Sequence, residues 1–283
     1  MFQKSTEDII NGIRSHKRDP VSYISKVIAE AKKEVKSTNQ ETKSIAIKKL
    51  TYLNMLGYNV SWASFPIVEA MSAERYTHRR VGMLAAAQTF NDDTDVILLC
   101  TNLLKKELKN SNNYEVGSAL SCLSNIATKE LSRDLINDVV PLLSSSSPYV
   151  RKKAVLTLYK LYLKYPHGLK LTYERLRQRL DDKDDSVVSC TVSVICELSR
   201  KNPKNFLPLA PQLFKVLTTS ENNWMLIKIV KLMTSLLSEE PRLARKLLEP
   251  LANLIREKEA SSLMYECVHA LTIALTYTVR SDG

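Results

Sequence analysis

The sequence SSPYVRKKAVLTLYKLYLKYP (residues 146–166) returns in related form 37 residues later as DDSVVSCTVSVICELSRKNP (residues 184–203). When the two blocks are superposed, their apolar positions and closing prolines coincide: Val150 with Val187, Val155 with Val192, Leu158 with Ile195, Leu161 with Leu198, and Pro166 with Pro203. Apolar residues three or four apart lie on one face of a helix. Each block therefore predicts an amphipathic helix, and the fixed period predicts a repeat protein.

The same pattern extends along most of the chain. Seven anchor positions follow one another at steps of 35–38 residues: Ile47, Leu84, Leu120, Val155, Val192, Val230 and Val268. The residues three and six positions after each anchor are also apolar, so each anchor marks the second helix of a pair. First helices are expected near 62–73, 95–109, 133–144, 169–181, 205–219 and 242–257. This period predicts an all-α, HEAT/armadillo-type superhelix (solenoid) of about seven helix pairs.

Two further helices are expected before the repeats, over residues 2–19 and 21–37. We expect residues 1–283 to form a single helical-repeat domain, because each pair buries its apolar face only by stacking on its neighbours. The last block, HALTIALTYTV (269–279), is still apolar where a terminal repeat should turn polar. We therefore expect the chain to be a fragment of a longer one, or its end to be covered by another chain.

Charge and composition restrict the possible partners. The formal net charge is +11, which favours acidic partners such as nucleic acid, anionic lipid headgroups or an acidic protein. No apolar run reaches the roughly 18 residues that a membrane-spanning helix requires, and the N-terminus lacks a secretion signal. The five cysteines stand singly within apolar helical patterns, as expected of buried, reduced thiols.

The sequence contains no constellation that predicts catalysis, a metal site or a cofactor site. The four histidines belong to different repeats, and none has another histidine or a cysteine three or four residues away. Phosphate-binding glycine loops and the GxSxG and HExxH motifs do not occur. The DDKDD cluster at 181–185 lacks the glycine and the final glutamate of a calcium loop. We interpret it as an inter-repeat turn that caps the next helix.

Basic residues gather near the starts of several second helices and form the candidate site. The candidate surface for anionic lipid or phosphoinositide comprises Lys43, Lys48, Lys49, Arg79 and Arg80, and the weaker candidates are Arg151, Lys152 and Lys153. Arg75, His78 and a first-helix group of Lys105, Lys106 and Lys109 lie nearby in the pattern. Two interpretations stay open: an anion-binding surface across the N-terminal repeats, or cations that tie adjacent repeats together. Nucleic acid is the weaker candidate, because no aromatic stacking ladder accompanies these residues.

Long stretches of the chain resemble a known family. The block KKLTYLNMLGYNVSWASFPIVEAMSAERYTHRRVGMLAAAQTF (48–90) resembles the N-terminal trunk of the large adaptins of clathrin-adaptor-type complexes, as do LSRDLINDVVPLLSSSSPYVRKKAV (131–155) and EPRLARKLLEPLANLI (240–255). The resemblance covers nearly the whole chain. It implies a non-enzymatic scaffold that pairs with a second large chain, a medium chain and a small sigma-type chain.

The resemblance also carries expectations about membranes. It implies cargo sorting from Golgi or endosomal membranes to lysosomes or vacuoles, on their cytosolic face, with recruitment by an Arf-family GTPase in the GTP state and by phosphoinositide. By rough alignment, the lipid-binding lysine cluster of a related large subunit falls on Lys43, Lys48 and Lys49. Here those lysines stand in KSIAIKKL, without an unbroken lysine run. The alternative is a generic HEAT-repeat transport receptor or assembly scaffold that recognises a peptide.

Overall fold

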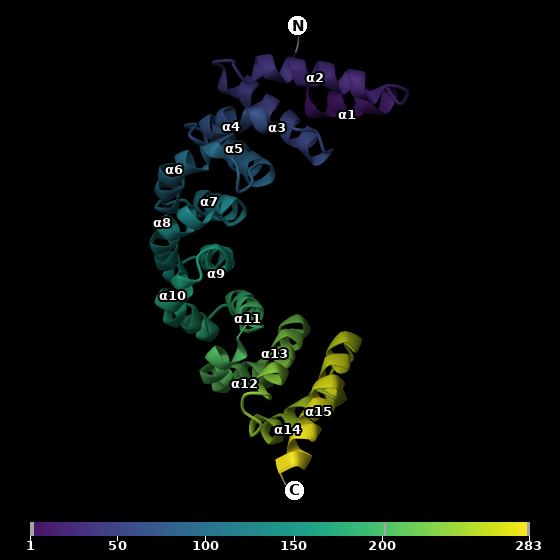
Figure 1. Cartoon of the computed structure of the whole chain (residues 1–283), viewed down its shortest axis with the longest axis vertical. Coiled ribbons are helices and arrows are strands. Elements are labelled where there is room, and N and C mark those ends of the chain that lie inside the picture. Colours follow the sequence, from purple (N-terminus) through teal and green to yellow (C-terminus); the bar gives the residue numbers. More distant parts are fainter. Residues whose placement is uncertain (1–2, 201, 282–283) are drawn as a thin grey trace. The chain divides into compact units, whose positions relative to one another are not determined.

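The computed structural model describes residues 3–200 and 202–281, and this part of the chain is helical, with no strand (Figure 1). The α-helices are α1 (Thr6–Ser15), α2 (Pro20–Glu34), α3 (Gln40–Met55), α4 (Ser64–Met71), α5 (Tyr76–Thr89), α6 (Cys100–Leu108), α7 (Asn113–Ile126), α8 (Lys129–Val139), α9 (Pro148–Lys164), α10 (His167–Arg177), α11 (Asp185–Ser199), α12 (Ala210–Thr219), α13 (Asn223–Leu236), α14 (Leu243–Glu257) and α15 (Ser261–Ser281). Short 3₁₀ segments extend five of the first helices: Ser61–Ala63, Asp95–Leu99, Val140–Ser144, Gln178–Asp181 and Pro203–Leu209. The all-α solenoid fold is confirmed.

Seven helix pairs, from α2–α3 to α14–α15, follow the leading helix α1 in the described residues. The seven anchors fall in the second helices α3, α5, α7, α9, α11, α13 and α15. The leading helix is shorter than the expected 2–19, because Ser5 caps its start and the helix ends at Ser15; residues 1 and 2 lie outside the described part. Ile9 of α1 is buried against Ile24, Val27 and Leu53 of α2 and α3.

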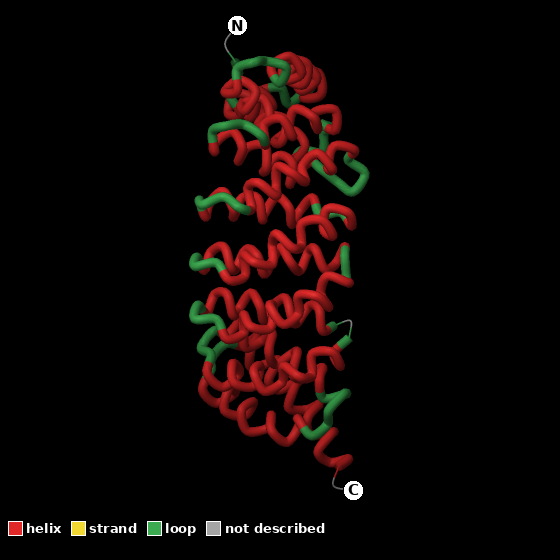
Figure 2. Tube along the Cα trace, turned by 90° about the vertical axis from the view of Figure 1, so that its left-hand side faces the viewer, coloured by secondary structure: helices red, strands yellow, loops and turns green. Residues whose placement is uncertain are grey.

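The chain divides into two compact units, residues 1–170 and 171–283, with the boundary inside α10. Within the first unit, the second helices α3, α5, α7 and α9 form one layer, and the first helices α4, α6 and α8 form the other (Figure 1). Within the second unit, α11, α13 and α15 pack side by side, and α12 and α14 pack against them. Figure 2 shows the helices of each unit stacked one above another. Whether the chain is a single domain stays a prediction.

Two of the seven predicted anchor positions are wrong by one residue. Leu84 of α5 and Val268 of α15 are exposed, whereas Met83 and Cys267 are buried in their place. In α5 the cause is Gly82, which faces α4: a Cβ built there would lie 2.5 Å from the backbone nitrogen of Met71. Two residues rotate a helix by about 200°, so Leu84 points away from that contact. In both helices adjacent residues are apolar, and periodicity alone does not choose between them.

Polar side chains set the starts of the second helices. Asn39, Asn112, Asp184 and Asn222 are the residues before α3, α7, α11 and α13, and the side chain of each accepts a hydrogen bond from the backbone N–H two residues later. These bonds satisfy donors that a helix N-terminus leaves without partners. The expected capping of the next helix by the acidic turn at 181–185 is confirmed, with Asp184 as the N-cap of α11. Ser147 occupies the N-cap position of α9, but its side chain makes no capping bond.

No described helix is both long and apolar enough to cross a membrane.

Candidate functional site

The corrected register places three candidate cations at one repeat position. With Met83 as the anchor of α5, Lys43, Arg79 and Arg151 each stand four residues before an anchor, in α3, α5 and α9. Equivalent positions of stacked repeats lie side by side on one surface. The structure shows what each of these side chains contacts.

Lys43 and Lys49 are buried, contrary to their expected place on an open surface. Lys43 is 5% exposed and its Nζ lies 2.7 Å from Glu69 Oε1; Lys49 is 1% exposed and its Nζ lies 2.5 Å from Glu34 Oε2. A buried ammonium group requires a paired charge, because desolvation otherwise costs several kcal/mol. Both ammonium groups therefore have intramolecular partners and are not presented to a ligand in this structure.

Arg79 joins two adjacent repeats, the α4–α5 pair and the α6–α7 pair. Its guanidinium donates to the carbonyl oxygens of Ala73 (3.0 Å) and Glu74 (2.5 Å), in the turn before its own helix. It also contacts Glu115 of α7, and its Nε lies 3.5 Å from Glu107 Oε1 of α6. The side chain is 15% exposed. Burial raises the pKa of the Glu107 carboxyl, and the charge of Arg79 opposes that shift. This site is an enclosed ion-pair cluster.

Arg151 repeats part of the Arg79 arrangement. It donates to the carbonyl oxygens of Ser145 (2.9 Å) and Ser146 (3.0 Å), six and five residues earlier, as Arg79 does in its own repeat. At this repeat position, the structure therefore supports the second interpretation, in which the cations stabilise the packing of the repeats and do not bind a ligand. The planar guanidinium fork explains why arginine suits two adjacent carbonyls.

The other candidate cations reach solvent to different degrees. Lys48 and Arg80 are exposed. Lys152 and Lys153 are half-buried, and Lys153 donates a hydrogen bond to Ser121 Oγ at 2.8 Å. In the first-helix group, Lys105 and Lys109 pair with Asp138, and Lys106 is exposed. Of the five stronger candidates, Lys48 and Arg80 are therefore the ones with accessible charge.

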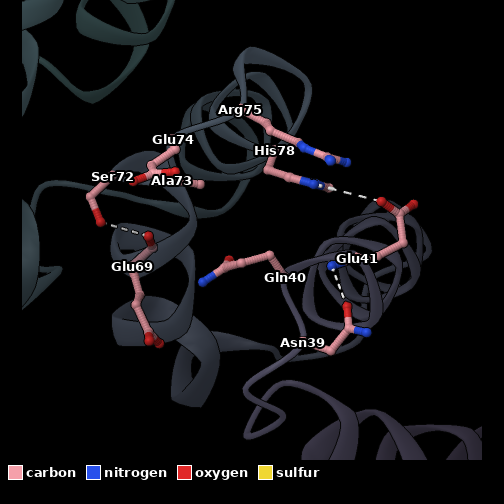
Figure 3. A pocket seen from close by; sticks show the side chains of 9 residues that line it. All are labelled: Asn39, Gln40, Glu41, Glu69, Ser72, Ala73, Glu74, Arg75 and His78. Atoms are coloured by element: carbon pink, nitrogen blue, oxygen red, sulfur yellow. Dashed lines mark hydrogen bonds and ion pairs between the residues drawn. The ribbon is translucent and has the colours of Figure 1, made fainter.

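A cavity of about 630 Å³ opens beside the buried cations, between the start of α3, the end of α4 and the start of α5 (Figure 3). Three carboxylates line it, those of Glu41, Glu69 and Glu74, together with Arg75 and His78. His78 Nε2 lies 3.6 Å from Glu41 Oε2, and Figure 3 shows these two side chains directed toward one another. Because carboxylates repel anions, this cavity does not suit a phosphorylated headgroup.

Sequence reasoning missed the carboxylates that neutralise the candidates. Glu69 and Glu107 stand at matching places in α4 and α6, 14 and 13 residues before the buried anchors Met83 and Leu120. Each faces the cation of the preceding repeat, Lys43 for Glu69 and Arg79 for Glu107. Aligning acidic as well as apolar positions would have revealed this repeated pair.

The acidic turn at 181–185 has the structural role expected of it. Asp184 caps α11, and Asp182 pairs with Arg179 at 2.9 Å. Nowhere in residues 3–200 and 202–281 do three histidine, cysteine or carboxylate side chains form a group that could hold a metal ion. Burial raises the pKa of Cys100 to about 11 and that of Cys196 to about 12, so both thiols stay protonated at neutral pH.

Comparison with known proteins identifies this braced helical solenoid. The Adaptin N terminal region family matches residues 21–279, so the chain belongs to the adaptins. It is 52% identical to "AP-3 complex subunit delta-1" of Bos taurus over 275 residues, and 50% identical to "AP-3 complex subunit delta" of Dictyostelium discoideum over 269 residues. These alignments cover 97% and 95% of this chain but 23% of each relative. The resemblance to large adaptins is confirmed. Within that family the sequence most resembles delta-adaptin, the large subunit of AP-3 complexes, and these two relatives bear that out.

Solved structures agree with the family. The chain superposes with a TM-score of 0.72 on a structure described as a "Homology model of the full-length AP-3 complex in an intermediate open conformation", at 44% identity, covering 84% of this chain and 42% of that one. A designed armadillo repeat protein matches with a TM-score of 0.55 at 18% identity. The second likeness supports the fold alone.

Proposed function

We propose that this chain is the N-terminal trunk of a large subunit of a vesicle-coat adaptor complex, acting as a non-enzymatic scaffold in intracellular protein transport. The observation that carries this proposal is identity of 50% or more with AP-3 delta subunits over nearly the whole chain. A generic solenoid receptor would share the fold without this identity, as the designed armadillo protein does. The chain spans about a quarter of the length of these relatives. We therefore propose, for the whole protein, the function of an adaptor-complex subunit.

The proposed partners are the second large chain, the medium chain and the small sigma-type chain of the complex. Exposed apolar side chains support a partner surface on the first unit. Phe65 of α4 and Leu98 of the adjoining 3₁₀ segment are each 63% exposed, and Leu99 is 54% exposed. Exposed apolar groups that lie near one another are typical of a protein–protein interface.

The proposed membrane role is recruitment to Golgi or endosomal membranes by an Arf-family GTPase and by anionic lipid, for cargo sorting to lysosomes or vacuoles. The chain would then lie peripherally on the cytosolic face. The positive net charge supports the lipid contact. Because Lys43, Lys49 and Arg79 are engaged with carboxylates, we assign the direct contact first to the exposed Lys48 of α3 and second to the exposed Arg80 of α5.

Charge reversal at Lys48 tests the lipid contact. We expect Lys48→Glu to lower co-sedimentation with phosphoinositide-containing vesicles about fivefold at low salt, since each basic residue near an anionic membrane contributes about 1 kcal/mol. Binding to phosphatidylcholine vesicles should not change. Lys129→Glu is the matched control, because Lys129 is exposed at the start of α8 in the other layer. Equal pelleting of the two variants would contradict the assignment of Lys48.

A further inference from the structure

A second cavity, of about 520 Å³, crosses the second-helix layer of the first unit from α5 over α7 to α9. Figure 1 shows these three helices in succession along one side of the unit. Fourteen residues line the cavity, and none of them is aspartate or glutamate. It differs in this from the cavity of Figure 3, where three carboxylates stand.

Two cations stand at the ends of this groove. Arg80 comes from α5 and Lys153 from α9, and neither makes an ion pair with any residue in the described part of the chain. Lys153 is held in place by its hydrogen bond to Ser121 Oγ (2.8 Å), and its Nζ lies 6.0 Å from the centre of the Tyr149 ring. An ammonium group has three donors, so Lys153 keeps two for a ligand. Arg80 is exposed and keeps its guanidinium fork available.

Aromatic and apolar side chains line the same groove beside the two cations. Tyr114 and Tyr149 lie with their ring centres 6.1 Å apart, and Leu84 lines the same cavity. Tyr114 is 69% exposed and Leu84 55%. Gly117 makes room for the aromatic surface, because a Cβ at that position would collide with the Tyr149 ring. The lining also offers polar groups for a peptide backbone, among them Ser118 and the exposed Asn125.

We propose that this groove binds an extended acidic peptide segment, with one carboxylate on Arg80, one on Lys153, and an apolar or aromatic side chain between them on Tyr114 and Tyr149. Two cations in a cavity without carboxylates supply charge complementarity for an acidic ligand. Neighbouring packed helices are about 8–10 Å apart, so α5 and α9 are separated by about 16–20 Å. At about 3.3 Å per extended residue, that distance corresponds to five or six residues.

The inference goes beyond the proposed scaffold role and does not depend on it. Peptide capture in the groove uses Lys153, which the lipid contact does not use. The lipid contact uses Lys48, which is not among the residues that line the groove. Arg80 takes part in both proposals, so the variants that separate them are those at Lys48 and Lys153, each of which belongs to one proposal alone.

Fluorescence anisotropy with a synthetic peptide tests the groove. The probe is fluorescein-labelled Gly-Ser-Glu-Ala-Phe-Ser-Ala-Glu-Ser-Gly, which carries two glutamates around a phenylalanine, and its control replaces both glutamates with glutamine. We expect salt-sensitive binding of the acidic probe to the 283-residue chain, weakened about tenfold or more by Arg80→Glu or by Lys153→Glu. Lys48→Glu and Lys129→Glu should leave the affinity unchanged. Thermal unfolding by circular dichroism verifies that every variant folds.

A variant that keeps both charges tests the aromatic part of the groove. Gly117→Ala should displace the Tyr149 ring and weaken binding of the phenylalanine probe several-fold, while a probe with serine in place of phenylalanine is unaffected. Any of three results would overturn the proposal: no binding of the acidic probe, equal binding of the glutamine probe, or full binding by both charge-reversed variants. Loss of vesicle binding in Lys153→Glu with no peptide binding would identify the groove as a membrane contact instead.

Discussion

Replacing Gly82 with leucine is expected to destabilise the unit of residues 1–170 by about 3 kcal/mol or more, because the α4–α5 contact has no room for a side chain. A Cβ at Gly82 would lie 2.5 Å from Met71 N and 2.8 Å from the carbonyl carbon of Ala70. Both are backbone atoms, so no side-chain rotation relieves the overlap. For a unit of this size, the thermal midpoint should fall by roughly 6–12 °C, measured by circular dichroism.

Leu84→Ala provides the control for the rotation of α5. Leu84 is 55% exposed, so its truncation should change the free energy of unfolding by less than about 0.5 kcal/mol. If Leu84 were buried instead, its truncation to alanine would lower the free energy of unfolding by about 2–5 kcal/mol. A large loss of stability in Leu84→Ala, with Gly82→Leu tolerated, would show that α5 is rotated differently from the arrangement described above.

Arg79→Ala is expected to have a comparable effect, about 3 kcal/mol, because it leaves two largely buried carboxylates without their shared cation. Glu107 and Glu115 are 8% and 12% exposed at their side chains. Arg79 also supplies the donors for the carbonyls of Ala73 and Glu74. Chemical denaturation measures the loss. Arg80→Ala is the matched control, since Arg80 is exposed and should cost less than about 0.5 kcal/mol.

The defect of Arg79→Ala should depend on pH. Burial already raises the pKa of Glu107, and removing Arg79 raises it further, because the arginine charge opposes that shift. A raised carboxyl pKa gives a stability contribution that is present at low pH and lost as pH rises through the folded-state value. The variant should therefore be most destabilised relative to the native chain near about pH 8, and less so toward about pH 5. A defect independent of pH would show that the carbonyl contacts account for the loss.

Much of the fold was predictable because the apolar pattern repeats. Stacked helix pairs need the same buried stripe in every repeat, so the seven second helices were found from their anchors. The rotation of α5 was not predictable from apolar residues, since Met83 and Leu84 are both apolar. Its cause is Gly82, whose contact with α4 is a tertiary feature.

The candidate site was predictable in position but not in exposure. Repeat alignment placed cations at equivalent or neighbouring positions, and the resemblance suggested a lipid role for some of them. Burial depends on carboxylates from other helices: Glu34 of α2 neutralises Lys49, and Glu69 of α4 neutralises Lys43. The groove from α5 to α9 joins residues about 70 positions apart, Arg80 and Lys153. The sequence alone shows where positive charges stand, but it does not distinguish a cation that is paired with a buried carboxylate from one that is free to bind a ligand.

Co-purification tests most directly the central claim that this chain is a scaffold segment of an adaptor complex. The chain would be co-expressed with a small sigma-type subunit of an AP-3 complex and examined by size-exclusion chromatography with light scattering, with the small subunit of a different adaptor complex as control. We expect a stable one-to-one complex with the AP-3 subunit that persists at physiological salt. Separate elution of the folded chain and the small subunit, or equal binding of the control subunit, would contradict it.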